Sequence, residues 1–175
     1  MQRLCGDYAV SAATLLPPHP PYPDGLAEVW IASLSEGAER GEAAAFAVTL
    51  ARDGTLIGGT RLRIETDHAR GELGFWIAKY CWGRGGYATE AVRAVIEYGF
   101  SALGLHRIHA MHFSRNPPAS GRVMAKCGMV HEGRFRGHIL KWGIYEDVDV
   151  WGILSAQVDL TGTHTSPVLS GGVPV

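Results

Sequence analysis

No apolar run in the 175-residue chain approaches the roughly 20 residues that a membrane-spanning helix needs. Residues 1–10 also lack the apolar core of a secretory signal. Cysteine is scarce, with three residues and no C-x-x-C pair, which argues against a disulfide framework and a structural zinc site. We therefore expect reduced thiols, no resident metal, no membrane association and a cytoplasmic location.

Net charge is almost absent, at −1 overall, but it is unevenly distributed. Residues 79–141 hold ten Lys and Arg against three Asp and Glu, so a basic middle lies within an otherwise acidic chain. Nucleic-acid-binding domains usually have a high isoelectric point, whereas this chain's is about 6.7. The pattern therefore favours a compact polyanion over a nucleic acid as partner, with a solvated basic surface as the alternative.

Apolar residues make up 46% of the chain, and their spacing predicts one α+β domain over residues 1–154. The proline-rich end of residues 1–23 predicts a stiff surface loop, and the Gly, Ser, Thr and Pro content of residues 155–175 predicts a disordered tail. Helices are expected over 26–36, from the glycines at 83–86 to Gly104, and over 119–127, with strands over 46–50, 55–65, 73–78, 108–112, 129–140 and 145–154.

The glycine-rich junction at 82–91 joins the third expected strand to the long helix. Its glycines allow backbone N–H groups to surround a ligand, and the start of a helix adds partial positive charge, so the junction predicts a phosphate cradle with Arg84 beside it. A Walker P-loop is excluded because no lysine stands in the required place. The dinucleotide pattern G-x-G-x-x-A is matched, but no Asp or Glu lies between Glu97 and Glu132 to bind the ribose. We expect a pyrophosphate bound outside a Rossmann fold.

Several strings occur in an order that resembles one family. They are Glu72-Leu73-Gly74-Phe75-Trp76-Ile77, the loop at 82–91, Gly104-Leu105-His106-Arg107-Ile108, residues 116–120, Lys126-Cys127-Gly128-Met129, Glu132-Gly133 and Tyr145-Glu146-Asp147. Together they resemble the GNAT superfamily of acyl-CoA N-acyltransferases, and within it the RimJ/RimL type, over roughly residues 20–154. The resemblance implies a mixed, mostly antiparallel, twisted sheet flanked by helices. The family's usual first strand is not found, so we expect an N-terminally shortened domain.

The resemblance also implies acetyl-CoA as co-substrate, with its pyrophosphate on the amides of about 84–89 and its pantetheine arm along 75–77. Compared with the family pattern, the phosphate loop carries one extra glycine, the segment before Ser120 carries one extra proline, and Trp151 replaces a tyrosine. The residues expected to contact the cofactor are Phe75, Trp76, Ile77, Arg84, Gly85, Gly86, Tyr87, Ala88, Thr89, Asn116, Ser120 and Lys126.

The implied chemistry needs a base for the acceptor amine and an acid for the leaving thiolate. Glu72 is the first candidate for the base and His138 the second, although either could be an ordinary strand residue. Ser120 and Tyr145 are candidates for the acid, with a helix N-cap and core packing as their respective alternatives. A backbone N–H near Ile77 is expected to hold the oxyanion.

The acceptor is expected to be a primary amine, either a protein N-terminus or a small amine, and the protein a monomer or homodimer. Aromatic residues that could line its pocket are Tyr22, Trp30, Phe75 and Trp142. The strand histidines His106, His109 and His112 do not suit a metal, because alternation points His109 away from the other two. The alternative to an N-acetyltransferase is a non-catalytic acyl-CoA-binding or interaction module.

Overall fold

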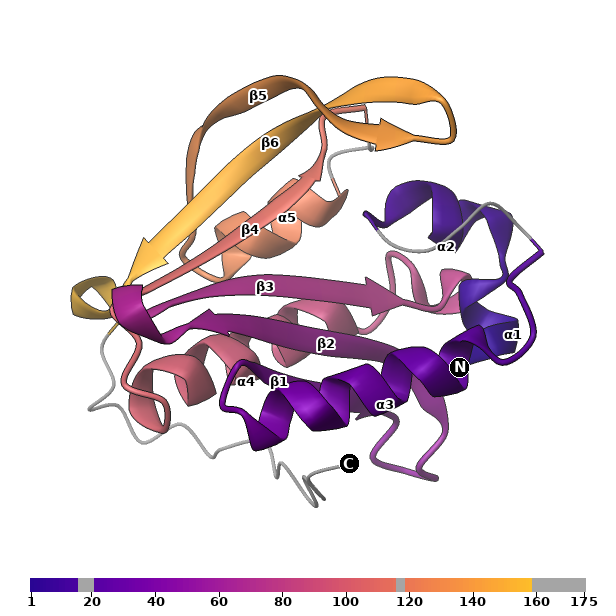
Figure 1. Cartoon of the computed structure of the whole chain (residues 1–175), viewed down its shortest axis with the longest axis horizontal. Helices are drawn as coiled ribbons and strands as arrows, with labels where there is room; N and C mark the ends of the chain where they lie inside the picture. Colours follow the sequence, from indigo (N-terminus) through magenta and orange to yellow (C-terminus); the bar gives the residue numbers. More distant parts are fainter. Residues whose placement is uncertain (16–20, 116–118, 159–175) are drawn as a thin grey trace.

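A six-stranded sheet forms the centre of the protein, in a computed structural model that describes residues 1–15, 21–115 and 119–158 (Figure 1). The strand order is β1-β2-β3-β4-β6-β5, and only β3 and β4 are parallel. This confirms the predicted α+β class with a mixed, mostly antiparallel sheet. The strands are β1 (Ala43–Thr49), β2 (Leu56–Glu65), β3 (Arg70–Ile77), β4 (Arg107–Phe113), β5 (Val130–Lys141) and β6 (Ile144–Leu154).

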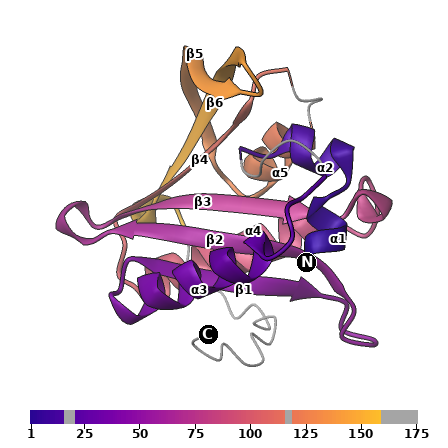
Figure 2. The same ribbon diagram turned by 45° about the vertical axis from the view of Figure 1, so that its right-hand side comes forward.

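Helices cover both faces of this sheet. Figure 1 shows α3 in front of the sheet with α1 and α2 at its right-hand end, and α4 and α5 behind; Figure 2 gives the same arrangement from a second angle. None of the helices in the described part of the chain has the length and apolar content needed to span a membrane. The helices are α1 (Gln2–Cys5), α2 (Tyr8–Ala13), α3 (Leu26–Glu39), α4 (Tyr87–Ser101) and α5 (Ala119–Lys126).

The N-terminal segment differs from its prediction. Instead of a loop it begins with α1 and α2, and Asp7 caps α2 by accepting a hydrogen bond from the N–H of Ala9 at 2.8 Å. The loop prediction depended on the prolines, which come after this stretch. Most of them fall at 16–20, outside the described residues. At the other end, Ser155–Gln157 form a short 3-10 turn, and the rest of the predicted tail beyond residue 158 also lies outside them.

The apolar residues of α4 show which side chains of the strands point to the rear face of the sheet. Val92, Val95, Ile96 and Phe100 are buried against residues of β2, β3 and β4 that include Leu62. Because side chains alternate along a strand, the neighbours of these core residues point to the front face, toward α3. Residues of the front face include Arg61, Arg63, Glu72, Gly74, Trp76, His109 and Met111.

Candidate active site

The parallel strands β3 and β4 pair over only half their length. Residues Arg70, Gly71, Glu72 and Leu73 of β3 are in register with β4, and pairing stops there. Beyond that point β3 stays paired with β2 as far as Ile77, while β4 stays paired with β6. The two strands therefore separate, as the diverging arrows in Figure 1 show, and we call the opening between them the β3–β4 groove.

A cavity of about 520 Å³ occupies this opening. It draws residues from the front face and from the rear, where α5 begins, so it connects the two sides of the sheet. Four of the predicted site residues line it together: Glu72, Phe75, Trp76 and Ser120. In the sequence, Ser120 is far from the other three residues, which lie on β3. All four line the same cavity because β3 and β4 separate at this point.

The glycine-rich loop behind this cavity presents free backbone donors. Gly83, Gly85 and Gly86 all have positive φ, between 63° and 70°, and the ring of Tyr87 packs directly over Gly85. Within residues 1–15, 21–115 and 119–158, no protein acceptor bonds the N–H groups of residues 85–89. Uncapped N–H groups at a helix start suit an anion. The extra glycine is accommodated as a further left-handed residue in this turn.

A second hollow of about 470 Å³ lies beside the loop. Three basic side chains, Arg3, Lys79 and Arg84, line it together with the carboxylate of Asp7. This concentration of positive charge next to free amides complements a polyanion such as a diphosphate. Arg3 comes from α1, which the sequence analysis did not expect.

One hydrogen bond ties the end of β3 to this loop. The indole Nε1–H of Trp82 donates to the carbonyl oxygen of Ile77 at 2.7 Å. Ile77 itself is buried in a small apolar cluster with Ile57 and Cys81. The end of the diverging strand is thus held in place by the residue that begins the phosphate loop.

Glu72 forms an ion pair across the sheet. Arg63 lies directly opposite on β2 and donates to the Glu72 carboxylate from both Nε, at 3.2 Å, and Nη2. The hydrogen bond and then the charge of Glu72 raise the pKa of Arg63. The pair holds the Glu72 carboxylate at the wall of the cavity, and the role of this residue as a base stays a prediction.

Ser120 lies in the first turn of α5, with His112 of β4 also lining the cavity. The Nε1–H of Trp151 donates to His112 Nε2 at 3.2 Å, and His112 Nδ1 lies 2.9 Å from the carbonyl of Phe113. These two contacts assign a neutral ring with its proton on Nδ1. Trp151, at the position where the family pattern has tyrosine, therefore positions a histidine in the cavity wall.

The three strand histidines, His106, His109 and His112, are not gathered with other potential metal ligands of the described ranges. Among the residues that the structure describes, no group of three or more His, Cys, Asp and Glu side chains is placed to hold a metal ion. His109 faces the front beside Glu72, and burial lowers its pKa. The three cysteines are free thiols, and burial raises the pKa of Cys5 and Cys127 to about 11.

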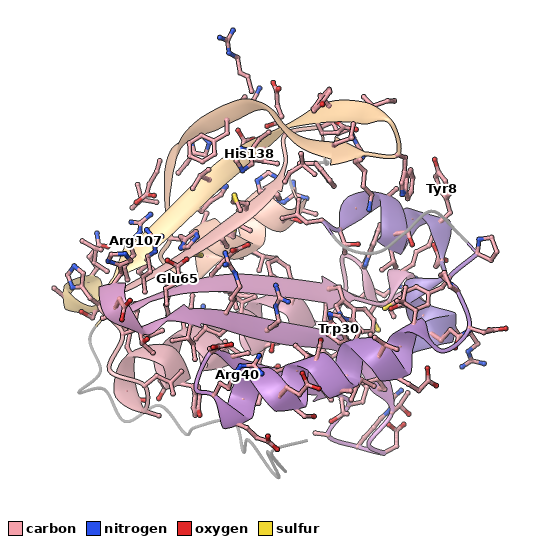
Figure 3. All side chains as sticks on the ribbon, in the orientation of Figure 1. Tyr8, Trp30, Arg40, Glu65, Arg107 and His138 are labelled. Carbon is pink, nitrogen blue, oxygen red and sulfur yellow. The ribbon has the colours of Figure 1, made fainter. Side chains whose placement is uncertain are left out.

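The other two catalytic candidates do not reach the cavity. β4 ends opposite Val148, so Tyr145, nearer the tip of the β5–β6 hairpin, pairs only with β5 and is 71% exposed. His138 lies in a register irregularity of β5, where it is exposed and contacts the ring of Phe135 (Figure 3). Its neighbour Ile139 lines the cavity instead. The irregularity interrupts the regular pairing of β5 with β6 at this point.

One predicted cofactor contact, Lys126, lies apart from these groups. Lys126 is exposed at the end of α5, where its carbonyl accepts a hydrogen bond from Arg93 Nη2 at 3.1 Å. Asn116 lies outside the described residues. Arg93 belongs to α4, so Lys126 lies near the side of the long helix rather than in the cavity.

Three of the four aromatic residues considered for the acceptor pocket line the cavity: Tyr22, Trp30 and Phe75. Figure 3 labels Trp30 on α3, which crosses in front of the sheet. Trp142 instead contacts Tyr8, with ring centroids 5.5 Å apart. Residues that the sequence analysis did not propose as lining are Met1, Cys5, Val10, Ala13, Thr14, Leu15, Leu26, Gly59, Thr60, Arg61, Leu73, Gly74, Met111, His112, Met124 and Ile139.

Comparison with family models finds a match to the acetyltransferase (GNAT) domain over residues 1–130. An uncharacterized N-acetyltransferase of Bacillus subtilis (strain 168), YoaA, is 41% identical over 90 residues, which are 51% of this chain and 50% of that protein. The spermidine N(1)-acetyltransferase of Vibrio cholerae serotype O1 is 30% identical over 135 residues, or 77% of this chain and 74% of that protein. The chain thus spans about half the length of YoaA and more of the Vibrio relative.

Two solved structures show the same fold. The spermidine N-acetyltransferase from Vibrio cholerae, in complex with CoA and spermine, superposes with a TM-score of 0.74 at 25% identity, over 89% of this chain and 88% of that one. RimJ from Mycobacterium smegmatis, in complex with CoA-disulfide, gives a TM-score of 0.76 at 23% identity, over 90% of this chain and 76% of that one.

Proposed function

This chain belongs to the GNAT acetyltransferase family, and from that premise we propose that it transfers an acetyl group from acetyl-CoA to a primary amine. The observation that carries the proposal is the groove between β3 and β4 with uncapped amides at the start of α4 beside it. Solved relatives of this fold are described as complexes with CoA or CoA-disulfide, which supports the same donor here.

The donor fits the residues present. Its diphosphate matches the free N–H groups of residues 85–89 and the charge of Arg84. Its pantetheine arm, which carries amide groups, matches the edge of β3 between Gly74 and Ile77 that no longer pairs with β4. When bound, acetyl-CoA would supply an activated thioester carbonyl, and a backbone N–H of this stretch would stabilise the oxyanion.

Glu72 and Ser120 are the residues we assign to proton transfer. The Glu72 carboxylate, oriented by Arg63, takes a proton from the acceptor ammonium, directly or through water. The amine then attacks the thioester carbonyl within a ternary complex, the carbon–sulfur bond breaks, and the nitrogen loses its second proton. Ser120 passes a proton to the departing sulfur and is reprotonated from solvent, so the net products are the acetylated amine, the free CoA thiol and one proton.

The experiment that tests this proposal measures both cofactor binding and turnover. The protein is incubated with acetyl-CoA and a panel of amines that includes amino acids, spermidine and short peptides with free N-termini. Release of the CoA thiol, matched by a mass increase of one acetyl group on an amine, is the expected result. CoA binding in native mass spectrometry without an acetylated product from any amine would contradict it and favour the non-catalytic acyl-CoA-binding module.

A further inference from the structure

Arg61 on β2 is a charged side chain of the cavity that the proposed reaction does not use. Its side chain lines the cavity and is half-buried. In the part of the chain that the structure covers, no carboxylate pairs with it and no hydrogen bond engages its guanidinium. The contrast is clear on the same sheet, where carboxylates pair with Arg63, Arg70, Arg107 and Arg134.

The space in front of Arg61 is open. Gly74 lies directly opposite on β3, and a Cβ atom built there would meet nothing within 4 Å. On the next position of the same face, the indole of Trp76 packs over Gly59. A half-buried guanidinium facing an open, partly apolar cavity is costly to leave unpaired, so its position indicates an anionic group on the bound molecule.

Glu72 provides the second point of recognition. Glu72 lies on β3 two residues before Gly74, which is the cross-strand partner of Arg61, and on the same face. Arg61 and Glu72 are therefore diagonal neighbours, and such neighbours lie roughly 7–8 Å apart. Resting on the proposed function, we propose that the acceptor is an α-amino acid, whose carboxylate binds Arg61 while its amine faces Glu72. Both groups are within reach of one small molecule, because an α-amino acid carries them on the same carbon.

The rest of the front wall selects the side chain of this acceptor. It is apolar and largely aromatic, formed by Tyr22, Leu26, Trp30 and Met111. Of the described Asp, Glu, Lys and Arg side chains, only Arg61 and Glu72 line the cavity. For a polyamine, the described lining of the cavity offers only the carboxylate of Glu72, which already pairs with Arg63. The guanidinium of Arg61 would repel it, because both are positively charged. The cavity fits an α-amino acid with an apolar or aromatic side chain.

The test compares acids with their amides on the unmodified protein. Steady-state kinetics are measured with L-leucine and L-phenylalanine, with L-leucinamide and L-phenylalaninamide, and with spermidine. We expect kcat/KM to be at least about 10-fold higher for the acids, since charge-assisted hydrogen bonds exceed neutral ones. The amine of an amino-acid amide is less basic than that of the free acid, so a larger fraction of it is unprotonated at neutral pH. A preference for the acids therefore cannot arise from amine basicity.

Variants of Arg61 then separate recognition from structure. Arg61→Gln should raise KM for the acids by about 10- to 100-fold and leave the amides unchanged. Arg61→Lys should restore part of the preference, because the charge returns without the planar fork. Arg40→Gln removes an exposed arginine at the end of α3, outside the cavity, and should change neither class.

Three results would overturn the inference while leaving the proposed function intact. These are equal use of acids and amides, an equal loss of both classes in Arg61→Gln, and turnover of spermidine in preference to either. Absence of any acetylated amine would instead contradict the proposed function itself, so the two failures are distinguishable.

Discussion

Arg63 and Glu72 are cross-strand partners on β2 and β3, and the guanidinium binds the carboxylate through two of its nitrogens. The pair places a permanently charged donor beside the proposed base and orients its carboxylate. It also lies in the last stretch of β3 that pairs with β4. The proposed base therefore lies where β3 is still paired with a neighbouring strand on both sides.

Replacing Glu72 with Gln should slow acetyl transfer by about 10²- to 10⁴-fold, because the amide cannot accept the amine proton. The dissociation constant for CoA should stay the same, since the donor contacts lie elsewhere. Glu65→Gln is the matched control, because Glu65 also pairs with an arginine on the front face but does not line the cavity. A turnover rate that matches the parent protein at every pH would remove Glu72 from the mechanism.

Replacing Arg84 with Ala should weaken CoA binding about two- to fivefold at low salt, with the difference shrinking as salt is added. The exposed guanidinium lines the hollow beside the phosphate loop, so its contribution is electrostatic and screened. Titration calorimetry with CoA and with pantetheine, which has no diphosphate, separates this effect from a change in fold. Equal loss of affinity for both molecules would argue against the placement of the diphosphate. Arg40→Ala, at the end of α3 and outside both hollows, provides the control.

Replacing Gly85 with Ala should reduce CoA affinity and stability together. The residue has φ of 63°, and a Cβ atom there would lie 2.5 Å from the ring of Tyr87, so the loop must shift. Gly54→Ala is the control, because Gly54 has φ of 71° in a turn where a Cβ meets nothing within 4 Å. It should carry the same backbone penalty of about 1 kcal/mol without changing CoA binding. Unchanged CoA affinity in the Gly85 variant would show that the loop does not hold the cofactor.

Acid stability should depend on Asp149. Hydrogen bonds from Arg134 are the main reason that its pKa falls from 3.8 to about 2. A carboxyl whose folded pKa is depressed contributes stability above its unfolded pKa and loses it as pH falls through the folded one. Urea unfolding should therefore show a loss of about 2 kcal/mol between about pH 5 and pH 2 from this group. Asp149→Asn should remove that part of the pH dependence, and an identical pH profile would contradict the assignment.

Most of the fold follows from local patterns. Alternation in β2 and the helical stripe of α4 were sufficient to predict both elements, because each buries one face against the other. The α3 helix extends through Gly37 to Glu39, beyond its predicted end. Gly37 remains helical there because its missing side chain lets α3 approach Ala43, a contact between elements that residue spacing does not reveal.

The candidate site could be predicted only in part. The phosphate loop is a contiguous string, so its residues were identified from the sequence, and Glu72 and Ser120 followed from the family resemblance. Arg61 was missed because its signal, a polar residue alternating with Leu62, is shared by every solvated strand. His138 was expected near the acceptor pocket, but it lies at an irregularity in β5, and its neighbour Ile139 lines the cavity instead.

The separation of β3 from β4 gives the backbone and the side chains different parts in the proposed reaction. The donor is expected at peptide groups between two three-stranded halves of the sheet. The proposed recognition of the acceptor depends instead on side chains in front of this opening, such as that of Arg61. We therefore expect that a substitution on β2 can change which amine is used without altering the main chain that would bind the thioester.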